Sequence, residues 1–483
     1  MDRKIVNAAK WSFLTEILAK LIVPVTNIIL AHILAPEAFG IMASLMMVVT
    51  FAQMLSDTGF QKFIVQHEFA DLKELHEAES VAFWANLGFQ LFIWILICVG
   101  KDSLAGVLGL KGMGNSLVAM GAILPLYAFT SIQTGILQRA FNFKKLLKVR
   151  MINIIMPLLI SVPLAFAGMD YWSLIFGFLG AQLGTAVFFF FFIPNEIKFY
   201  FNFNILKSMA RYSTWSVVES ISIWLTVWCD TFIVGTFLSS YYLGLYKMPA
   251  AVVNTVMGVI SSSIVPVLFS ALSREQNHFE KFKKIFFSFQ KIIGMIVIPM
   301  GVGMFVYRQF IVNLIFGKQW SESALVLGCW ALSSAIMLPT ANIISEVFRA
   351  KGLPIISFLC QILHLVVLIP VVYIFAQKSF TSLIYARSIV RAELLIVELL
   401  FLYCITKINP IAALNNIYRY ILVAIVMGGF GYLTSSLSNS FLWIIMTIIL
   451  SAVLYFGLLL LFKSDRILII NCISSLKNKI GRR

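Results

Sequence analysis

The sequence predicts an all-α integral membrane protein with about 14 transmembrane helices. Hydrophobic residues make up 60% of the 483-residue chain and charged residues only 12%, which is too little polar surface to cover a water-soluble body of this size. Apolar runs of about 20 residues, the length of helix that crosses a bilayer core, recur along the whole chain. The same composition excludes disordered, collagen-like and nucleic-acid-binding proteins, despite a net charge of +16.

The predicted spans follow one another with short connections, and we expect each to be a helix. Their approximate bounds are 11–34, 38–58, 78–100, 117–137, 150–168, 172–193, 211–238, 243–270, 285–306, 324–345, 354–376, 380–405, 417–437 and 441–462. A membrane barrel would show short segments of alternating hydrophobicity instead of these long apolar runs.

The basic residues predict the orientation of the spans. Of the 37 Lys and Arg residues, 27 fall in the two termini and the loops on their side, five fall in the opposite loops and five fall inside spans. Cytoplasmic loops of membrane proteins carry such an excess of Lys and Arg. Both termini are therefore predicted to be cytoplasmic, which requires an even number of spans.

An internal repeat relates the two halves of the chain. A shift of 204 residues aligns the first span with the seventh, and places Trp11 on Trp215 and Gly40 on Gly244. Six spans separate the copies, so they share one orientation and form a parallel repeat. The chain is therefore expected to consist of two six-helix lobes and two further C-terminal helices, at 1–200, 207–405 and 412–483.

Charged residues within the first and seventh spans are candidates for function, because they are costly in hydrocarbon and usually face a bundle interior. Glu16 and Lys20 are one helical turn apart in the first span. Glu16 is a candidate for ion coupling and Lys20 for substrate binding, and the alternative is that they only neutralise each other. Glu219 and Asp230 have no basic neighbour in the seventh span and are the leading candidates for coupling to a proton or cation.

Two arginines in the twelfth span, Arg387 and Arg391, are also one turn apart. Guanidinium groups on one helix face can bind an anion through several donors. The alternative is an internal ion-pair ladder with Glu393 and Glu398. Lys247 is a further candidate for substrate binding, although a lysine near the end of a span can simply extend to the interface.

The chain shows no sequence pattern of a soluble enzyme. It contains no Gly-rich phosphate loop and no HExxH motif, and its five histidines do not cluster. We therefore expect a protein that is not an enzyme and uses no metal or cofactor, with a proton or Na⁺ gradient as the source of energy.

Five short motifs carry a resemblance that covers essentially the whole chain. They are Leu34–Gly40, Asp57–Gly59, Arg139–Lys144, Pro266–Ser270 and Phe316–Trp320. In their order and spacing the chain resembles the polysaccharide or oligosaccharide flippases of the multidrug/oligosaccharidyl-lipid/polysaccharide exporter superfamily. The resemblance implies two lobes around a cavity that opens alternately to each side of the bacterial cytoplasmic membrane.

The resemblance also implies the substrate and the partners. The expected substrate is an oligosaccharide linked to undecaprenyl diphosphate, moved from the inner to the outer leaflet. A glycan polymerase and glycosyltransferases are expected partners. Three alternatives stay open: a lipid II flippase, an ion-coupled drug or cation antiporter, which usually has twelve spans, and a membrane-embedded glycan polymerase, which would need a longer external loop.

Asp57 and Gly59 close the second predicted span and have two interpretations. Gly59 could end the helix as a left-handed cap. Alternatively, Asp57 and Gly59 could form a cytoplasmic latch between the lobes, with Asp57 accepting a hydrogen bond from a basic residue opposite.

Overall fold

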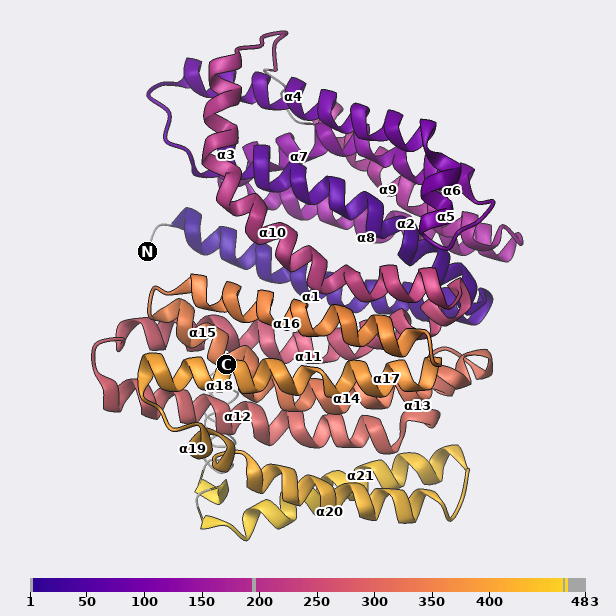
Figure 1. Ribbon diagram of the computed structural model, residues 1–483, viewed down its shortest axis with the longest axis vertical. Coiled ribbons are helices and arrows are strands. Elements are labelled where there is room, and N and C mark those ends of the chain that lie inside the picture. Colours follow the sequence, from indigo (N-terminus) through magenta and orange to yellow (C-terminus); the bar gives the residue numbers. More distant parts are fainter. Residues whose placement is uncertain (1–2, 193–196, 464, 468–483) are drawn as a thin grey trace. The chain divides into compact units, whose positions relative to one another are not determined.

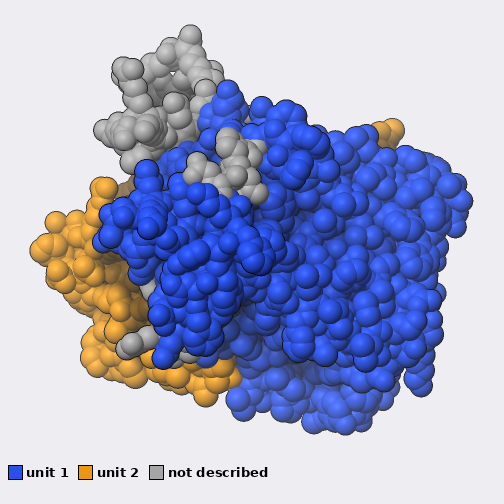
Figure 2. All heavy atoms as spheres, turned by 90° about the horizontal axis from the view of Figure 1, so that it is seen from above, with its two compact units in different colours: residues 1–248, 315–320, 365–383 blue, residues 249–314, 321–364, 384–483 orange. Residues whose placement is uncertain are grey.

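The computed structural model describes residues 3–192, 197–463 and 465–467, and every regular element in these ranges is a helix. The predicted all-α class is therefore confirmed (Figure 1). The chain divides into two compact units, coloured separately in Figure 2. Unit 1 comprises residues 1–248, 315–320 and 365–383, and unit 2 comprises 249–314, 321–364 and 384–483. These units are defined by compactness. The division into two six-helix lobes and two further C-terminal helices was inferred from the sequence repeat, and it stays a prediction.

Unit 1 contains the first ten α-helices. They are α1 (Arg3–Ile33), α2 (Pro36–Ser56), α3 (Lys62–Gln66), α4 (Leu72–Val99), α5 (Lys101–Val107), α6 (Gly114–Gly121), α7 (Ile123–Arg139), α8 (Phe143–Phe166), α9 (Asp170–Phe192) and α10 (Phe203–Phe237), with the π-helix η1 (Asp57–Gln61) between α2 and α3. The helices α11 (Ser240–Arg274), α16 (Pro354–Ala376) and α17 (Phe380–Ile389) and the 3₁₀-helix η2 (Lys318–Ser323) each contribute to both units.

Unit 2 contains the remaining elements apart from Ile315, the last residue of α13. They are α12 (Phe279–Val306), α13 (Arg308–Ile315), α14 (Ala324–Met337), the π-helix η3 (Leu338–Asn342), α15 (Ile343–Ala350), α18 (Arg391–Thr406), α19 (Pro410–Asn415), α20 (Tyr418–Ser435) and α21 (Phe441–Leu460). Side chains of α12, α20 and α21 form one apolar core that includes Ile298, Tyr420 and Tyr455.

Twelve helical stretches in the described residues are long and apolar enough to cross a membrane. They correspond to twelve of the expected spans, and the count of 14 is not confirmed. The first expected span lies in α1, which runs from Arg3 to Ile33, and among its described side chains the apolar stretch is Leu18–Ile33. The twelfth expected span is divided between α17 and α18 at Val390.

The second predicted span does not end at Gly59. The helix continues from α2 through the π-helix η1 into α3, and the backbone N–H of Lys62 donates to the carbonyl oxygen of Asp57. This i to i+5 bond defines a π-turn. Phe63 and Ile64 are buried in an apolar cluster with α4 and α7, and this burial favours continued helix. The interpretation of Gly59 as a left-handed cap is therefore wrong.

The two glycines that the repeat aligns lie against each other in unit 1. A β-carbon on Gly40 of α2 would overlap the Ser240 carbonyl oxygen, and one on Gly244 of α11 would overlap the Pro36 carbonyl oxygen. The first turns of the two helices therefore touch backbone to backbone. Only glycine permits such an approach, since any side chain would force the helices apart.

We expect Gly40→Ala to lower the stability of the protein by about 1–3 kcal/mol, because the added methyl group overpacks a contact made of backbone atoms. The matched control is Gly258→Ala in α11, where a β-carbon would have nothing within 4 Å. Thermal unfolding of the purified variants measures both effects. If the two variants have the same apparent melting temperature, the close contact does not limit stability.

Candidate functional site

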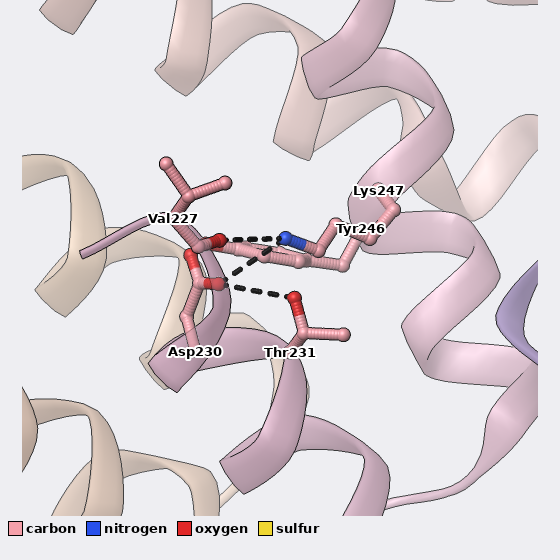
Figure 3. A network of polar contacts seen from close by, with 5 residues as sticks. All are labelled: Val227, Asp230, Thr231, Tyr246 and Lys247. Carbon is pink, nitrogen blue, oxygen red and sulfur yellow. Dashed lines mark hydrogen bonds and ion pairs between the residues drawn. The ribbon is translucent and has the colours of Figure 1, made fainter. Parts of the chain in front are cut away.

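A buried ion pair lies between the end of α10 and the start of α11 (Figure 3). Asp230 is only 3% exposed, and its Oδ1 lies 3.2 Å from the Nζ of Lys247. Its Oδ2 accepts a hydrogen bond of 2.7 Å from the Tyr246 hydroxyl. The Nζ of Lys247 also donates to the carbonyl oxygen of Val227 at 3.2 Å. The carboxylate of Asp230 is thereby both neutralised and hydrogen-bonded, as a buried charge requires.

Two further contacts hold the pair in place. The Thr231 hydroxyl donates to Asp230 Oδ1 at 3.3 Å, and the Lys247 ammonium group lies 5.1 Å from the centre of the Trp228 ring. Aromatic faces attract cations in this geometry. The Lys247 side chain nevertheless stays 23% exposed, against 5% for the Asp230 side chain. The lysine is thus the partner that a ligand can reach.

The structure brings together two residues that the sequence assigned to different roles, Asp230 to ion coupling and Lys247 to substrate binding. The sequence alone does not indicate that they form an ion pair, because they lie on different spans. A signal was present, however: the chain turns at Leu238 and Ser239, and the two residues lie equally far before and after this turn. Residues placed in this way on antiparallel neighbouring helices lie at the same depth.

The other charged candidates on the first and seventh spans lie apart from this pair or cannot be assessed. Glu219 is exposed on α10, and the 11 residues to Asp230 correspond to about 16 Å along the helix. Lys20 is half-buried on α1. The side chain of Glu16 lies outside the described residues, so the predicted Glu16–Lys20 pair cannot be placed.

The two arginines of the twelfth predicted span stack on one tryptophan in unit 2. The guanidinium carbons of Arg387 and Arg391 lie 5.1 and 4.2 Å from the ring centre of Trp330 in α14. Arg391 Nη1 also donates to the hydroxyl groups of Ser333 and Ser334, both at 2.9 Å. Trp330, Ser333 and Ser334 share one face of α14 by their spacing. That face is a signal that the sequence already carries.

The two glutamates proposed to neutralise these arginines have other neighbours. Glu393 Oε2 lies 2.8 Å from Nδ1 of His364, which is buried on α16. Glu398 is buried, and its Oε1 accepts a hydrogen bond of 2.9 Å from the Ser345 hydroxyl. The ion-pair ladder and the anion site both stay predictions, which differ in how they tolerate lysine in place of arginine.

Asp57 belongs to a polar network that joins η1 to α7. Both carboxylate oxygens accept from the Tyr127 hydroxyl at 2.7 Å, and the Ser131 hydroxyl donates to Oδ1 at 3.2 Å. Ser131 also donates to Gln61 Oε1. These contacts attach the π-turn at Asp57 and Gly59 to α7, whereas a latch between lobes remains a prediction.

The final question for the site is whether its side chains could bind a metal ion. In the part of the chain that the structure describes, no group of three or more His, Cys, Asp and Glu side chains is arranged to hold a metal ion.

Several known proteins are similar to this chain in sequence or in fold. The succinoglycan biosynthesis transport protein ExoT of Rhizobium meliloti (strain 1021) is 25% identical over 66% of this chain, and the match covers 64% of that protein's length. The lipopolysaccharide biosynthesis protein WzxC of Escherichia coli (strain K12) is 22% identical over 78% of this chain and 76% of its own. Among solved structures, the lipid II flippase MurJ in an inward closed conformation has a TM-score of 0.76 at 16% identity, and the alignment covers 95% of this chain and all of MurJ.

MurJ therefore shares the fold of this chain, and the sequence itself gives the family. Residues 29–325 match the family described as "Polysaccharide biosynthesis protein". This match covers more than half of the chain, from the last turn of α1 to the start of α14. The chain belongs to the polysaccharide biosynthesis protein family.

Proposed function

We propose that this protein is a flippase that moves an oligosaccharide linked to undecaprenyl diphosphate across the bacterial cytoplasmic membrane for the synthesis of a surface polysaccharide. The observation that carries the proposal is the family match over residues 29–325. Two further findings support it: relatives are named for succinoglycan transport and lipopolysaccharide biosynthesis, and a lipid flippase shares the fold.

Membrane topology and partners follow from the same proposal. Both termini face the cytoplasm by the distribution of basic residues. Glycosyltransferases on that side would supply the lipid-linked unit, and a polymerase on the other side would consume it. The protein itself breaks and forms no covalent bond in this scheme, so it is not an enzyme.

The Asp230–Lys247 pair gives this transporter a means of coupling. A diphosphate carries the charge and the acceptor oxygens to draw Lys247 away from Asp230. Asp230 would then need a new counter-charge, which a proton or Na⁺ could supply. Substrate and ion would thereby each bind one member of the ion pair, and the energy of the gradient would be used when that pair opens and closes.

Alternating access needs a contact that closes one side of the transport pathway. The Gly40–Gly244 contact joins helices that the sequence repeat relates, and in the proposed scheme it is the closure on the external side.

A lipid II flippase is the second candidate, because the MurJ structure shares the fold over 95% of this chain. Both substrates carry a diphosphate on a polyprenyl lipid, so the sites described above would serve either. The two candidates differ in which lipid accumulates when the protein is absent.

We expect a strain that carries Arg387→Lys and Arg391→Lys to accumulate lipid-linked oligosaccharide in the cytoplasmic leaflet at normal protein level. Lysine keeps the charge but loses the planar, multi-donor group that can stack on Trp330 and bind phosphate oxygens. The matched control is Arg349→Lys on α15, a half-exposed side chain paired with Glu346. Export equal to that of the parent would make the two arginines structural, and accumulation of lipid II instead would favour the second candidate.

We expect the double variant Asp230→Asn/Lys247→Gln to fold but to lose the dependence of transport on the ion gradient, because no charge pair is left to exchange. Asp230→Asn alone should lower stability by several kcal/mol, since it leaves Lys247 without its counter-ion in a buried site. Transport in vesicles with and without an imposed gradient, together with thermal unfolding, measures both. A double variant with the gradient dependence of the parent would exclude this pair from coupling.

A further inference from the structure

One face of α12 carries basic residues into the membrane-spanning part of unit 2. Glu280, Lys283, Lys284 and Lys291 follow the spacing of a single helical face. With Phe287 and Ser288 of the same face they line a cavity of about 320 Å³. From Glu280 to Lys291 the helix rises about 16 Å, enough to lead from an aqueous loop through the interfacial region of a bilayer.

Lys291 also lines a second, smaller cavity of about 80 Å³, which it shares with the start of α20. There Arg419 Nη1 lies 2.9 Å from Asp465 Oδ2, and the Tyr420 hydroxyl donates to Asp465 Oδ1 at 3.0 Å. Both oxygens of this carboxylate are thus engaged by residues other than Lys291. The two cavities together form a basic groove, defined here as the α12 groove, with Lys291 at the junction.

The α12 groove has an excess of positive charge. Three lysines line it, and Glu280 is the one carboxylate on the same helix face. Within the described residues, no carboxylate oxygen lies within 4.0 Å of Nζ of Lys283, Lys284 or Lys291. Lys281, which does not line the cavity, is instead the lysine that pairs with Glu275, at 3.8 Å. An anion with several oxygens can accept hydrogen bonds from more than one such ammonium group.

The surroundings of the groove favour a lipid over a soluble anion. The groove begins at the first turns of α12, whose lysines the distribution of charge places at the cytoplasmic surface. Beyond Lys291 the same helix enters the apolar core that it forms with α20 and α21. A headgroup phosphate in the groove would therefore lie at the depth at which its acyl chains can follow apolar helix surface.

We propose that the α12 groove binds the phosphate of an anionic phospholipid headgroup from the cytoplasmic leaflet. Basic pockets between membrane helices on the cytoplasmic side are suited to this role. The bound lipid would tie the start of α12 to the start of α20. This site takes a resident lipid, so it is separate from the proposed transport of a glycan-linked lipid and does not depend on it.

Binding to the purified full-length protein tests the proposal without any transport. Native mass spectrometry in detergent would count molecules of phosphatidylglycerol retained by the parent and by the variant Lys283→Gln/Lys284→Gln/Lys291→Gln. The matched control, Lys144→Gln/Lys145→Gln/Lys148→Gln, removes the same charge from the first turns of α8, which are also predicted to face the cytoplasm. We expect the first variant to bind about tenfold or more weakly and the control to bind as the parent does.

Equal loss of binding in both triple variants would overturn the proposal, because it would reduce the effect to net charge. Phosphatidylcholine and inorganic phosphate serve as further probes, and the proposal requires that neither binds at the concentration at which phosphatidylglycerol saturates. Equal binding of inorganic phosphate would assign the groove to a soluble anion instead. Should the triple variant unfold, Lys291→Gln alone must still weaken binding, because Lys291 lines both cavities.

Discussion

The ion pair between Asp230 and Lys247 is the interaction on which the proposed mechanism most depends. A carboxylate that is 3% exposed on a membrane-spanning helix is costly unless a counter-charge and hydrogen bonds accompany it. Lys247, Tyr246 and Thr231 provide both. The pair holds the end of α10 against the start of α11. When the pair separates, each of the two charges needs a new counter-charge. This requirement is what links an ion to a substrate in the proposed function.

Other polar groups of the long helices are also held by neighbouring side chains. Arg387 and Arg391 share the face of Trp330, and His364 contacts Glu393. Asp57 is held by hydroxyl groups of α7. The α12 groove differs from these sites, because its three lysines lack carboxylate partners within 4.0 Å in the described residues. That difference is the reason to assign the groove to an external anion.

The sequence predicts the helical class well, because twenty-residue apolar runs can satisfy their backbone in lipid only as helices. The count of spans depends on where a long helix is divided, as the twelfth expected span is at Val390. Gly59 shows a different limit. Glycine after a helical run is a common terminator, but the burial of Phe63 and Ile64 favours continuation through a π-turn, and no local pattern reveals that tertiary contribution.

For the candidate site, the residue types were predictable and their partners were not. Asp230, Lys247, Arg387 and Arg391 stand out because charge is rare inside spans. Their neighbours Tyr246, Trp330 and His364 are ordinary residues of apolar helices, and only the packing of two helices makes them partners. The alignment of Gly40 with Gly244 is an exception. In that case a repeat in the sequence identified two residues that touch in the structure.

The most direct test of the account is reconstitution of the purified protein into vesicles that contain undecaprenyl-diphosphate-linked oligosaccharide. A membrane-impermeant glycosidase added outside would measure how much of the oligosaccharide reaches the outer leaflet. The account predicts that the protein increases this fraction, that an ion gradient accelerates the process, and that Asp230→Asn/Lys247→Gln abolishes the acceleration. If the folded protein leaves the oligosaccharide in its original leaflet under both proton and Na⁺ gradients, the proposed function is contradicted.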